Sequence, residues 1–173
     1  QFFDPFCGSG TILIEAAMIA TRFAPGLLRT HFGFYAWRDH QAALFDQVRE
    51  KLQAQILKDP DQLPRFLGSD QNVKVLEIAE RNIENAGFSG LIELKAMPFE
   101  IAEPVAPKGL IVCNPPYGVR MGDEEHLIPL YSKMGSNFKH KYKGWHAGVI
   151  TSSKKLLQAI SLKPSKKHTL HNG

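Results

Sequence analysis

The chain opens with Gln1-Phe2-Phe3-Asp4-Pro5-Phe6-Cys7-Gly8-Ser9-Gly10-Thr11, a short apolar run that leads directly into a glycine-rich turn. The following segment, TILIEAAMIAT at 11–21, is rich in helix formers and apolar nearly all round, which is typical of a helix packed against a sheet. A strand, a tight turn and a buried helix in succession indicate an α/β fold. Glycines in such a turn let the backbone approach a ligand closely, because no side chain blocks the path.

The alternation of strands and helices continues to the end of the chain. We expect strands at 65–68, 91–96, 109–113, 147–151 and 167–171, and helices at 73–86, 125–138 and 154–160. The run GLIVC at 109–113 is continuously apolar, as in parallel strands that are buried on both faces. This order predicts a mostly parallel, doubly wound α/β sheet with ligands at the carboxyl ends of its strands.

The chain is long enough for one hydrophobic core, and we expect a single domain over 1–173 with an insertion at about 22–64. Within the insertion, a helix is expected at 40–57. Because the chain has no initiator methionine and ends in Asn172-Gly173, a dipeptide that favours hairpin turns, we expect a domain truncated at both ends. The insertion carries an aromatic group and one apolar helical stripe: Phe32, Phe34, Tyr35 and Trp37, then Leu44, Val48, Leu52 and Ile56.

Charge is distributed unevenly along the sequence. Residues 1–125 hold 12 Lys and Arg against 17 Asp and Glu, whereas residues 126–173 hold nine Lys and no acidic residue. Such a tract attracts nucleic-acid phosphates, and a solvated lysine face is the alternative. Two cysteines, with no apolar run long enough to span a bilayer and no signal core, predict a protein of the reducing cytoplasm without a membrane segment or a metal site. Most of the basic tract is formed by Lys139, Lys141, Lys143, Lys154, Lys155, Lys163, Lys166 and Lys167.

The turn at 4–11 is neither of two better-known nucleotide motifs. A P-loop needs a Lys and a Ser or Thr after its last glycine, and the dinucleotide fingerprint needs a third glycine where this chain has Leu13. A nucleotide-like cofactor is the favoured interpretation, and a tight turn without a ligand is the alternative.

Two further motifs follow predicted strands. Gly68-Ser69-Asp70 places a carboxylate where it can accept hydrogen bonds from ribose hydroxyls, although Ser69 or Asp70 at the N-cap of the next helix is the alternative. Asn114-Pro115-Pro116-Tyr117-Gly118 holds an amide rigidly beside a flat ring. Its amide oxygen and the Pro115 carbonyl can accept hydrogen bonds from an amine while Tyr117 stacks on a planar base. A plain turn with a packed tyrosine is the alternative.

In combination, Asp4 to Thr11 with Ile14-Glu15-Ala16-Ala17, Gly68 to Asp70 and Asn114 to Gly118 resemble the bacterial 23S ribosomal RNA guanine-N(2) methyltransferases that carry a THUMP domain. The resemblance covers nearly the whole chain, including the insertion with its Ala24-Pro25-Gly26 and Phe32-Gly33-Phe34. It implies a Rossmann-like class I fold, S-adenosylmethionine as cofactor, large-subunit ribosomal RNA as substrate and a THUMP domain elsewhere in the protein.

The resemblance also implies the site residues. The acceptor would be the 2-amino group of guanine, reached once the base has left its helix. One departure concerns the cofactor adenine, because relatives often place an acidic residue after the third strand where this chain reads Lys95-Ala96-Met97-Pro98-Phe99-Glu100. Backbone atoms of 97–99, or Glu100, are the alternatives. The implied cofactor contacts are Asp4, Pro5, Cys7, Gly8, Ser9, Gly10, Thr11, Ser69, Asp70, Met97, Pro98 and Phe99, and the implied catalytic residues are Asn114, Pro115, Pro116 and Tyr117, with no metal.

Two other classes of protein stay open at this point. The motif Asn-Pro-Pro-Tyr also occurs in methyltransferases that act on adenine in DNA or on glutamine in proteins. A non-catalytic RNA-binding module is the second alternative.

Overall fold

The computed structural model describes residues 1–118 and 123–171, and within these residues five strands form one parallel sheet. The order across the sheet is β3-β2-β1-β4-β5. Five α-helices and four 3-10 helices accompany the strands. In chain order the elements are β1 (Phe2–Asp4), α1 (Thr11–Thr21), η1 (Pro25–Leu28), η2 (Gly33–Ala36), α2 (Ala42–Ala54), η3 (Pro60–Gln62), β2 (Phe66–Asp70), α3 (Val73–Asn85), β3 (Ile92–Ala96), η4 (Phe99–Ile101), β4 (Leu110–Cys113), α4 (Asp123–His140), β5 (His146–Val149) and α5 (Lys154–Ala159).

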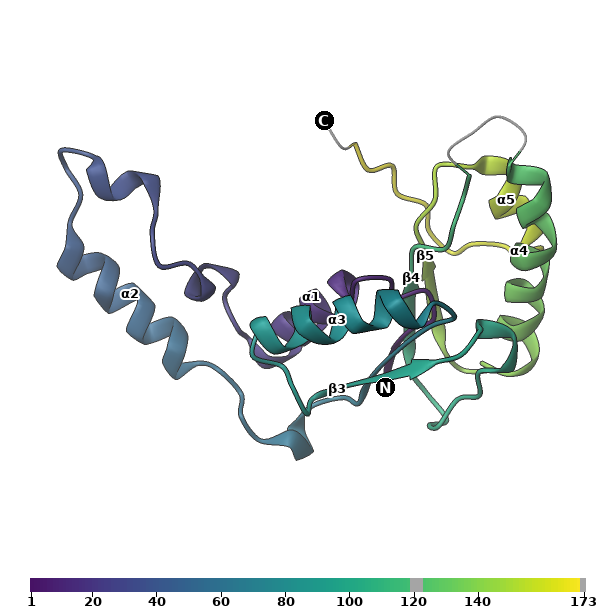
Figure 1. Cartoon of the computed structure of the whole chain (residues 1–173), viewed down its shortest axis with the longest axis horizontal. Helices are drawn as coiled ribbons and strands as arrows, with labels where there is room; N and C mark the ends of the chain where they lie inside the picture. The colour runs from purple at the N-terminus through teal and green to yellow at the C-terminus, as the bar shows by residue number, and fades with distance from the viewer. Residues whose placement is uncertain (119–122, 172–173) are drawn as a thin grey trace.

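Helices cover both faces of the sheet, with α1 and α3 on one side and α4 and α5 on the other (Figure 1). Successive residues of a strand point to opposite faces. Phe2 therefore packs with Leu13 of α1 in one core cluster, and Phe3 packs with Tyr131 and Met134 of α4 in the other. Burial on both faces explains why β4, which lies beside β1, is continuously apolar.

The connections reverse direction next to β1. The chain runs outward from β1 through β2 to β3, then returns to place β4 on the other side of β1, with Phe3 paired to Leu67 and to Ile111. Such a reversal leaves a crevice at the carboxyl ends of the two central strands, where α/β sheets bind ligands. The predicted parallel, doubly wound sheet is confirmed.

Most predicted elements lie within a few residues of the observed ones, and the helix at 11–21 has the bounds predicted for it. The strand predicted at 167–171 is wrong. Residues 161–171 form no strand and are exposed throughout, because strand structure needs a neighbour that offers paired hydrogen bonds. The turn expected at Asn172-Gly173 lies outside the described residues. No described helix combines the length and apolarity that crossing a membrane requires.

Residues 22–64, which we call the arm, extend away from the sheet beyond the end of α1 (Figure 1). The arm contains η1, η2, α2 and η3, and none of the side chains whose burial is described there is buried. The helix predicted at 40–57 is shorter, at Ala42–Ala54. Leu44 and Val48 of the predicted apolar stripe are exposed, so the stripe does not face the core.

Candidate functional site

The turn after β1 requires glycine at two positions. Gly8 and Gly10 have φ angles of 53° and 85°, in the left-handed region that side-chain-bearing residues rarely adopt. A Cβ at Gly10 would also lie 3.3 Å from the Cβ of Ala79 in α3. The turn consequently presses against α3 as it enters α1, whose N-terminal N–H groups face the carboxyl edge of the sheet.

The end of β2 holds this turn in place. The Cys7 N–H donates to the Ser69 carbonyl at 3.0 Å, and the Gly8 N–H donates to Asp70 Oδ2 at 3.2 Å. Asp70 Oδ1 accepts from the Asn72 N–H at 2.9 Å. The first two motifs, far apart in the sequence, therefore form one structure.

The helix-capping alternative for Ser69 and Asp70 is wrong. Asn72 is the N-cap of α3, with its side chain accepting a hydrogen bond from the Lys74 N–H. Ser69 lies inside β2 and is buried, with its hydroxyl 3.5 Å from the Pro5 carbonyl. The Asp70 side chain is half-buried and accepts hydrogen bonds from the Gly8 N–H of the turn and from the Asn72 N–H just before α3, so Asp70 itself is not the N-cap.

Asp4, the last residue of β1, has a buried carboxylate with one oxygen that lacks a partner. Oδ1 accepts a hydrogen bond from the Phe6 N–H at 3.1 Å, whereas Oδ2 is buried with no hydrogen-bond partner among the described residues. Burial raises the pKa of Asp4 from an ordinary 3.8 to about 7, the Phe6 hydrogen bond opposes the change, and the nearby Asp70 carboxylate adds to it. Such an oxygen suits a cationic or N–H-bearing ligand group.

The segment after β3 borders Asp70. The Met97 N–H donates to the Asp70 carbonyl at 3.1 Å. The Phe99 ring is 1% exposed and belongs to the core, so Phe99 can meet a ligand only through its backbone. Met97, Pro98 and Glu100 are half-buried, and both alternatives for adenine recognition stay open.

A side chain near the end of α4 and one just beyond it fix the position of this segment. Asn137 Nδ2 donates to the Phe99 carbonyl at 3.0 Å, and Lys141 Nζ donates to the Glu100 carbonyl at 3.1 Å. The sequence did not single out either residue for this role, because the contacts join positions about 40 residues apart.

The Asn114–Tyr117 segment leaves the sheet beside Asp4. Its strand, β4, neighbours β1, and the Ile150 N–H that follows β5 donates to the Cys113 carbonyl at 2.9 Å. The Asn114 side chain is exposed, and Pro115 is fully buried. Tyr117 is half-buried against the cluster beneath α4, which leaves part of its surface accessible.

Asn82 of α3 is a further residue that the sequence analysis missed. Its Nδ2 donates to the Ser9 carbonyl at 2.9 Å and so ties the glycine-rich turn to α3. The available signal was a polar side chain one residue before the buried Ile83 on the packed side of a predicted helix. Thr11 is exposed at the start of α1, with its hydroxyl 3.4 Å from that of Ser9.

Neither thiol near the site is poised for chemistry. Burial raises the pKa of Cys7 to about 12 and the pKa of Cys113 still further, with the nearby Asp4 carboxylate contributing to both. The thiols therefore stay protonated at neutral pH. In the described part of the chain, no three His, Cys, Asp or Glu side chains gather as metal ligands would.

The predicted motifs thus meet at one edge of the sheet, on either side of the reversal between β1 and β4. A model of the protein family described as "UPF0020: RMKL-like, methyltransferase domain" matches residues 1–173. The chain belongs to this family.

Relatives within the RMKL-like family are similar along the whole chain. Ribosomal RNA large subunit methyltransferase K/L of Legionella pneumophila (strain Corby) is 43% identical over 171 residues, covering 98% of this chain and 24% of that protein. The protein of the same name from Shewanella amazonensis is 43% identical over 172 residues, with the same coverage. The chain therefore spans about a quarter of the length of these curated relatives.

Solved structures share the fold. The chain superposes on SMU.472, a putative methyltransferase complexed with SAH, with a TM-score of 0.90 at 36% identity, covering all of this chain and 45% of that one. A predicted N6-adenine-specific DNA methylase from Listeria monocytogenes gives a TM-score of 0.88 at 33% identity, covering 99% and 44%. The predicted Rossmann-like methyltransferase fold is confirmed.

Proposed function

We propose that this chain transfers a methyl group from S-adenosylmethionine to the exocyclic 2-amino group of a guanine in large-subunit ribosomal RNA. The observation that carries the proposal is the meeting of three loops at the reversal of the sheet, where Asp4, Asp70 and Asn114 leave neighbouring strands. The names of the Legionella and Shewanella relatives support the substrate class.

The residues at the edge fit the cofactor. Its amino-acid portion carries an ammonium and a carboxylate, and the unpartnered Asp4 Oδ2 suits the ammonium while the N–H groups that begin α1 suit the carboxylate. Asp70 lies where ribose hydroxyls are expected, and the backbone of 97–99 lies next to it. Bound there, S-adenosylmethionine supplies an electrophilic methyl group.

The acceptor side depends on Asn114 and the Pro115 carbonyl. The lone pair of an exocyclic amine is delocalised into the ring, which makes the nitrogen a poor nucleophile. By accepting the amine protons, these two oxygens orient the lone pair and stabilise the positive charge that develops on nitrogen. Tyr117 stacks on the base, which must leave its helix to reach the site.

Methylation of adenine in DNA is the alternative with a specific observation behind it, the name of the Listeria neighbour. Guanine carries its exocyclic amine at position 2 of the ring, and adenine carries it at position 6. Removing one of these amines from the substrate therefore identifies the methyl acceptor. We expect the protein, given labelled S-adenosylmethionine and unmodified ribosomal RNA, DNA and protein, to label RNA alone. Replacing guanine by inosine, which lacks the 2-amino group, should abolish labelling. Label in DNA or protein, or in the inosine transcript, contradicts the proposal.

The cofactor half of the proposal has its own test. Calorimetry should detect binding of S-adenosylhomocysteine to the wild-type chain and at least about tenfold weaker binding to Asp4→Ala, since a charge-assisted hydrogen bond is lost. Equal affinity of the two proteins contradicts the placement of the ammonium at Asp4. A non-catalytic RNA-binding module predicts no affinity for this ligand.

A further inference from the structure

The arm is a structured lobe with an aromatic cluster of its own. Phe32 stacks on Phe34 with ring centroids 5.0 Å apart, and Phe45 of α2 packs edge-on against Phe34 at 5.3 Å. The Leu57 N–H, three residues beyond α2, donates to the carbonyl of Thr21, the last residue of α1, at 2.9 Å. The packed rings and this hydrogen bond therefore give the arm a structure of its own.

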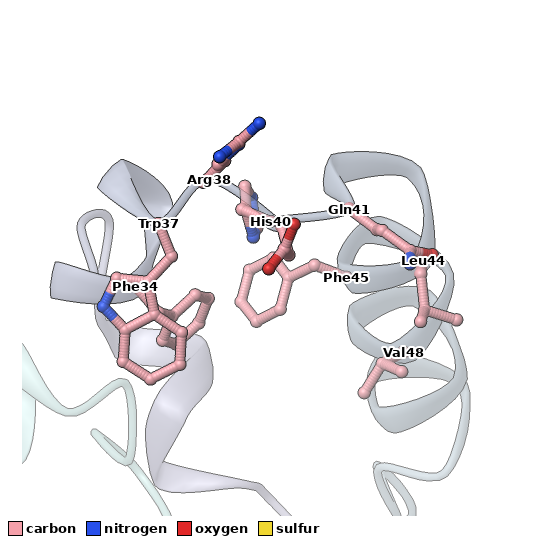
Figure 2. Close-up of a pocket in the computed structure, with 9 residues that line it drawn as sticks. Phe34, Trp37, Arg38, His40, Gln41, Leu44, Phe45 and Val48 are labelled. Carbon is pink, nitrogen blue, oxygen red and sulfur yellow. The ribbon is translucent and has the colours of Figure 1, made fainter.

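A hollow opens beside this cluster, between η2 and the start of α2 (Figure 2). Its volume is about 540 Å³, within the range of about 300–1,000 Å³ that is usual for small-ligand sites. Figure 2 shows Phe34 and Trp37 on one side, Leu44 and Val48 on the other, His40 and Phe45 between them, and Arg38 and Gln41 at the rim.

Trp37 lines this hollow with an exposed aromatic ring. Its side chain is 73% exposed, yet its backbone is fixed, because its N–H donates to the Phe34 carbonyl at 3.0 Å and its carbonyl accepts from the His40 N–H at 3.1 Å. The indole also meets the edge of the Phe34 ring, with centroids 6.2 Å apart. An exposed aromatic ring held in this way loses little freedom when a planar group stacks on it.

Exposed arginines in the first part of the arm can attract a phosphate-bearing partner. Residues 22–38 contain Arg22, Arg29 and Arg38 and no acidic residue, and all three side chains are exposed. No ion pair to them is found in the described part of the chain. Acidic residues follow along the chain: Asp39 lines the hollow beside Arg38, and Asp46 and Glu50 lie in α2. The Asp39 carboxylate can accept from the amino group of a base.

We propose that the hollow holds one unpaired base of the RNA that the protein modifies, stacked on Trp37 opposite Leu44 and Val48, with Arg38 beside its phosphate. The inference rests on the proposed RNA substrate and adds a second point of contact away from the methyl acceptor.

The test is a fluorescence titration of the chain with short single-stranded RNA. Stacking should quench Trp37, whereas Trp145 is half-buried and donates its Nε1–H to the Ala106 carbonyl. Trp37→Ala should abolish quenching and weaken binding about five- to 150-fold, the range for one stacked base. Trp37→Phe should recover much of the affinity. The matched control is Ile19→Ala, which removes an apolar side chain that is 79% exposed on α1.

Each other outcome overturns the inference. If wild type and Trp37→Ala bind RNA with equal affinity, no base stacks in the hollow. The same conclusion follows if an abasic oligonucleotide quenches the fluorescence equally well. Self-association that Trp37→Ala abolishes, without quenching by RNA, assigns the hollow to a protein contact. Trp37→Ala should leave the affinity for S-adenosylhomocysteine, measured by calorimetry, unchanged. Failure of the proposed function is seen in a different experiment, as methyl label on a group other than guanine.

Discussion

Asp70 Oδ2 accepts a hydrogen bond from the Gly8 N–H at 3.2 Å, across 62 positions of sequence. This bond holds the glycine-rich turn against the end of β2, so two loops of the site are joined directly. A single carboxylate therefore serves both the shape of the turn and the place proposed for ribose.

Replacing Asp70 should loosen the turn and weaken cofactor binding together. Asp70→Ala leaves the Gly8 and Asn72 N–H groups without their acceptor, and we expect about ten- to 100-fold weaker binding of S-adenosylhomocysteine by calorimetry. Asn72→Ala is the control, because it removes the N-cap of α3 and costs about 1 kcal/mol of stability without touching the turn. Similar loss of affinity in both variants would mean that stability alone explains the effect.

Asp4 should make the stability of the ligand-free protein depend on pH. Because burial raises its pKa from 3.8 to about 7, the folded protein holds a proton that the unfolded chain has already lost within this range. The free energy of unfolding should therefore fall as pH rises from about 4 to about 7, by up to about 4 kcal/mol from this residue. Urea unfolding should show a shallower decline for Asp4→Asn than for wild type, and parallel curves would refute the assignment.

Asn114 should matter for methyl transfer and not for folding. Its side chain is exposed, so Asn114→Ala should leave the thermal midpoint and the affinity for S-adenosylhomocysteine unchanged. The rate of transfer should fall about 100- to 1,000-fold, as for the loss of one hydrogen-bonding group that acts on the transition state. Asn114→Asp keeps an acceptor oxygen at this position and should lose less. A rate unchanged in Asn114→Ala would remove the residue from the reaction.

Gly68 should be the least replaceable glycine in the sheet. A Cβ there would overlap Leu13 Cδ1 and lie 2.8 Å from Leu94 Cδ2 and 3.2 Å from Cys7 Sγ, so Gly68→Ala should cost about 1–3 kcal/mol through overpacking. Gly33→Ala, where a Cβ meets nothing within 4 Å, is the control and should be nearly neutral. Equal unfolding free energies in urea for the two variants would contradict the packing described around β2.

Local patterns determined much of this protein in advance. The helix at 11–21, the glycine turn before it and the strand at 109–113 are set by residues that are neighbours in sequence, because periodicity and turn chemistry act over a few positions. Neighbouring residues also determine which motifs follow directly after strands. Because the strands are parallel, their carboxyl ends then lie at one edge of the sheet.

Only the tertiary structure decided what surrounds each group. The unpartnered Asp4 Oδ2, the core position of the Phe99 ring and the contact from Asn82 to Ser9 depend on elements far away in sequence. The same holds for the missing strand at 167–171, which has no neighbour to pair with, and for the Leu44 stripe, which faces a hollow instead of a core. Burial and pairing are properties of the assembled fold, so a local pattern can nominate a residue without fixing its environment.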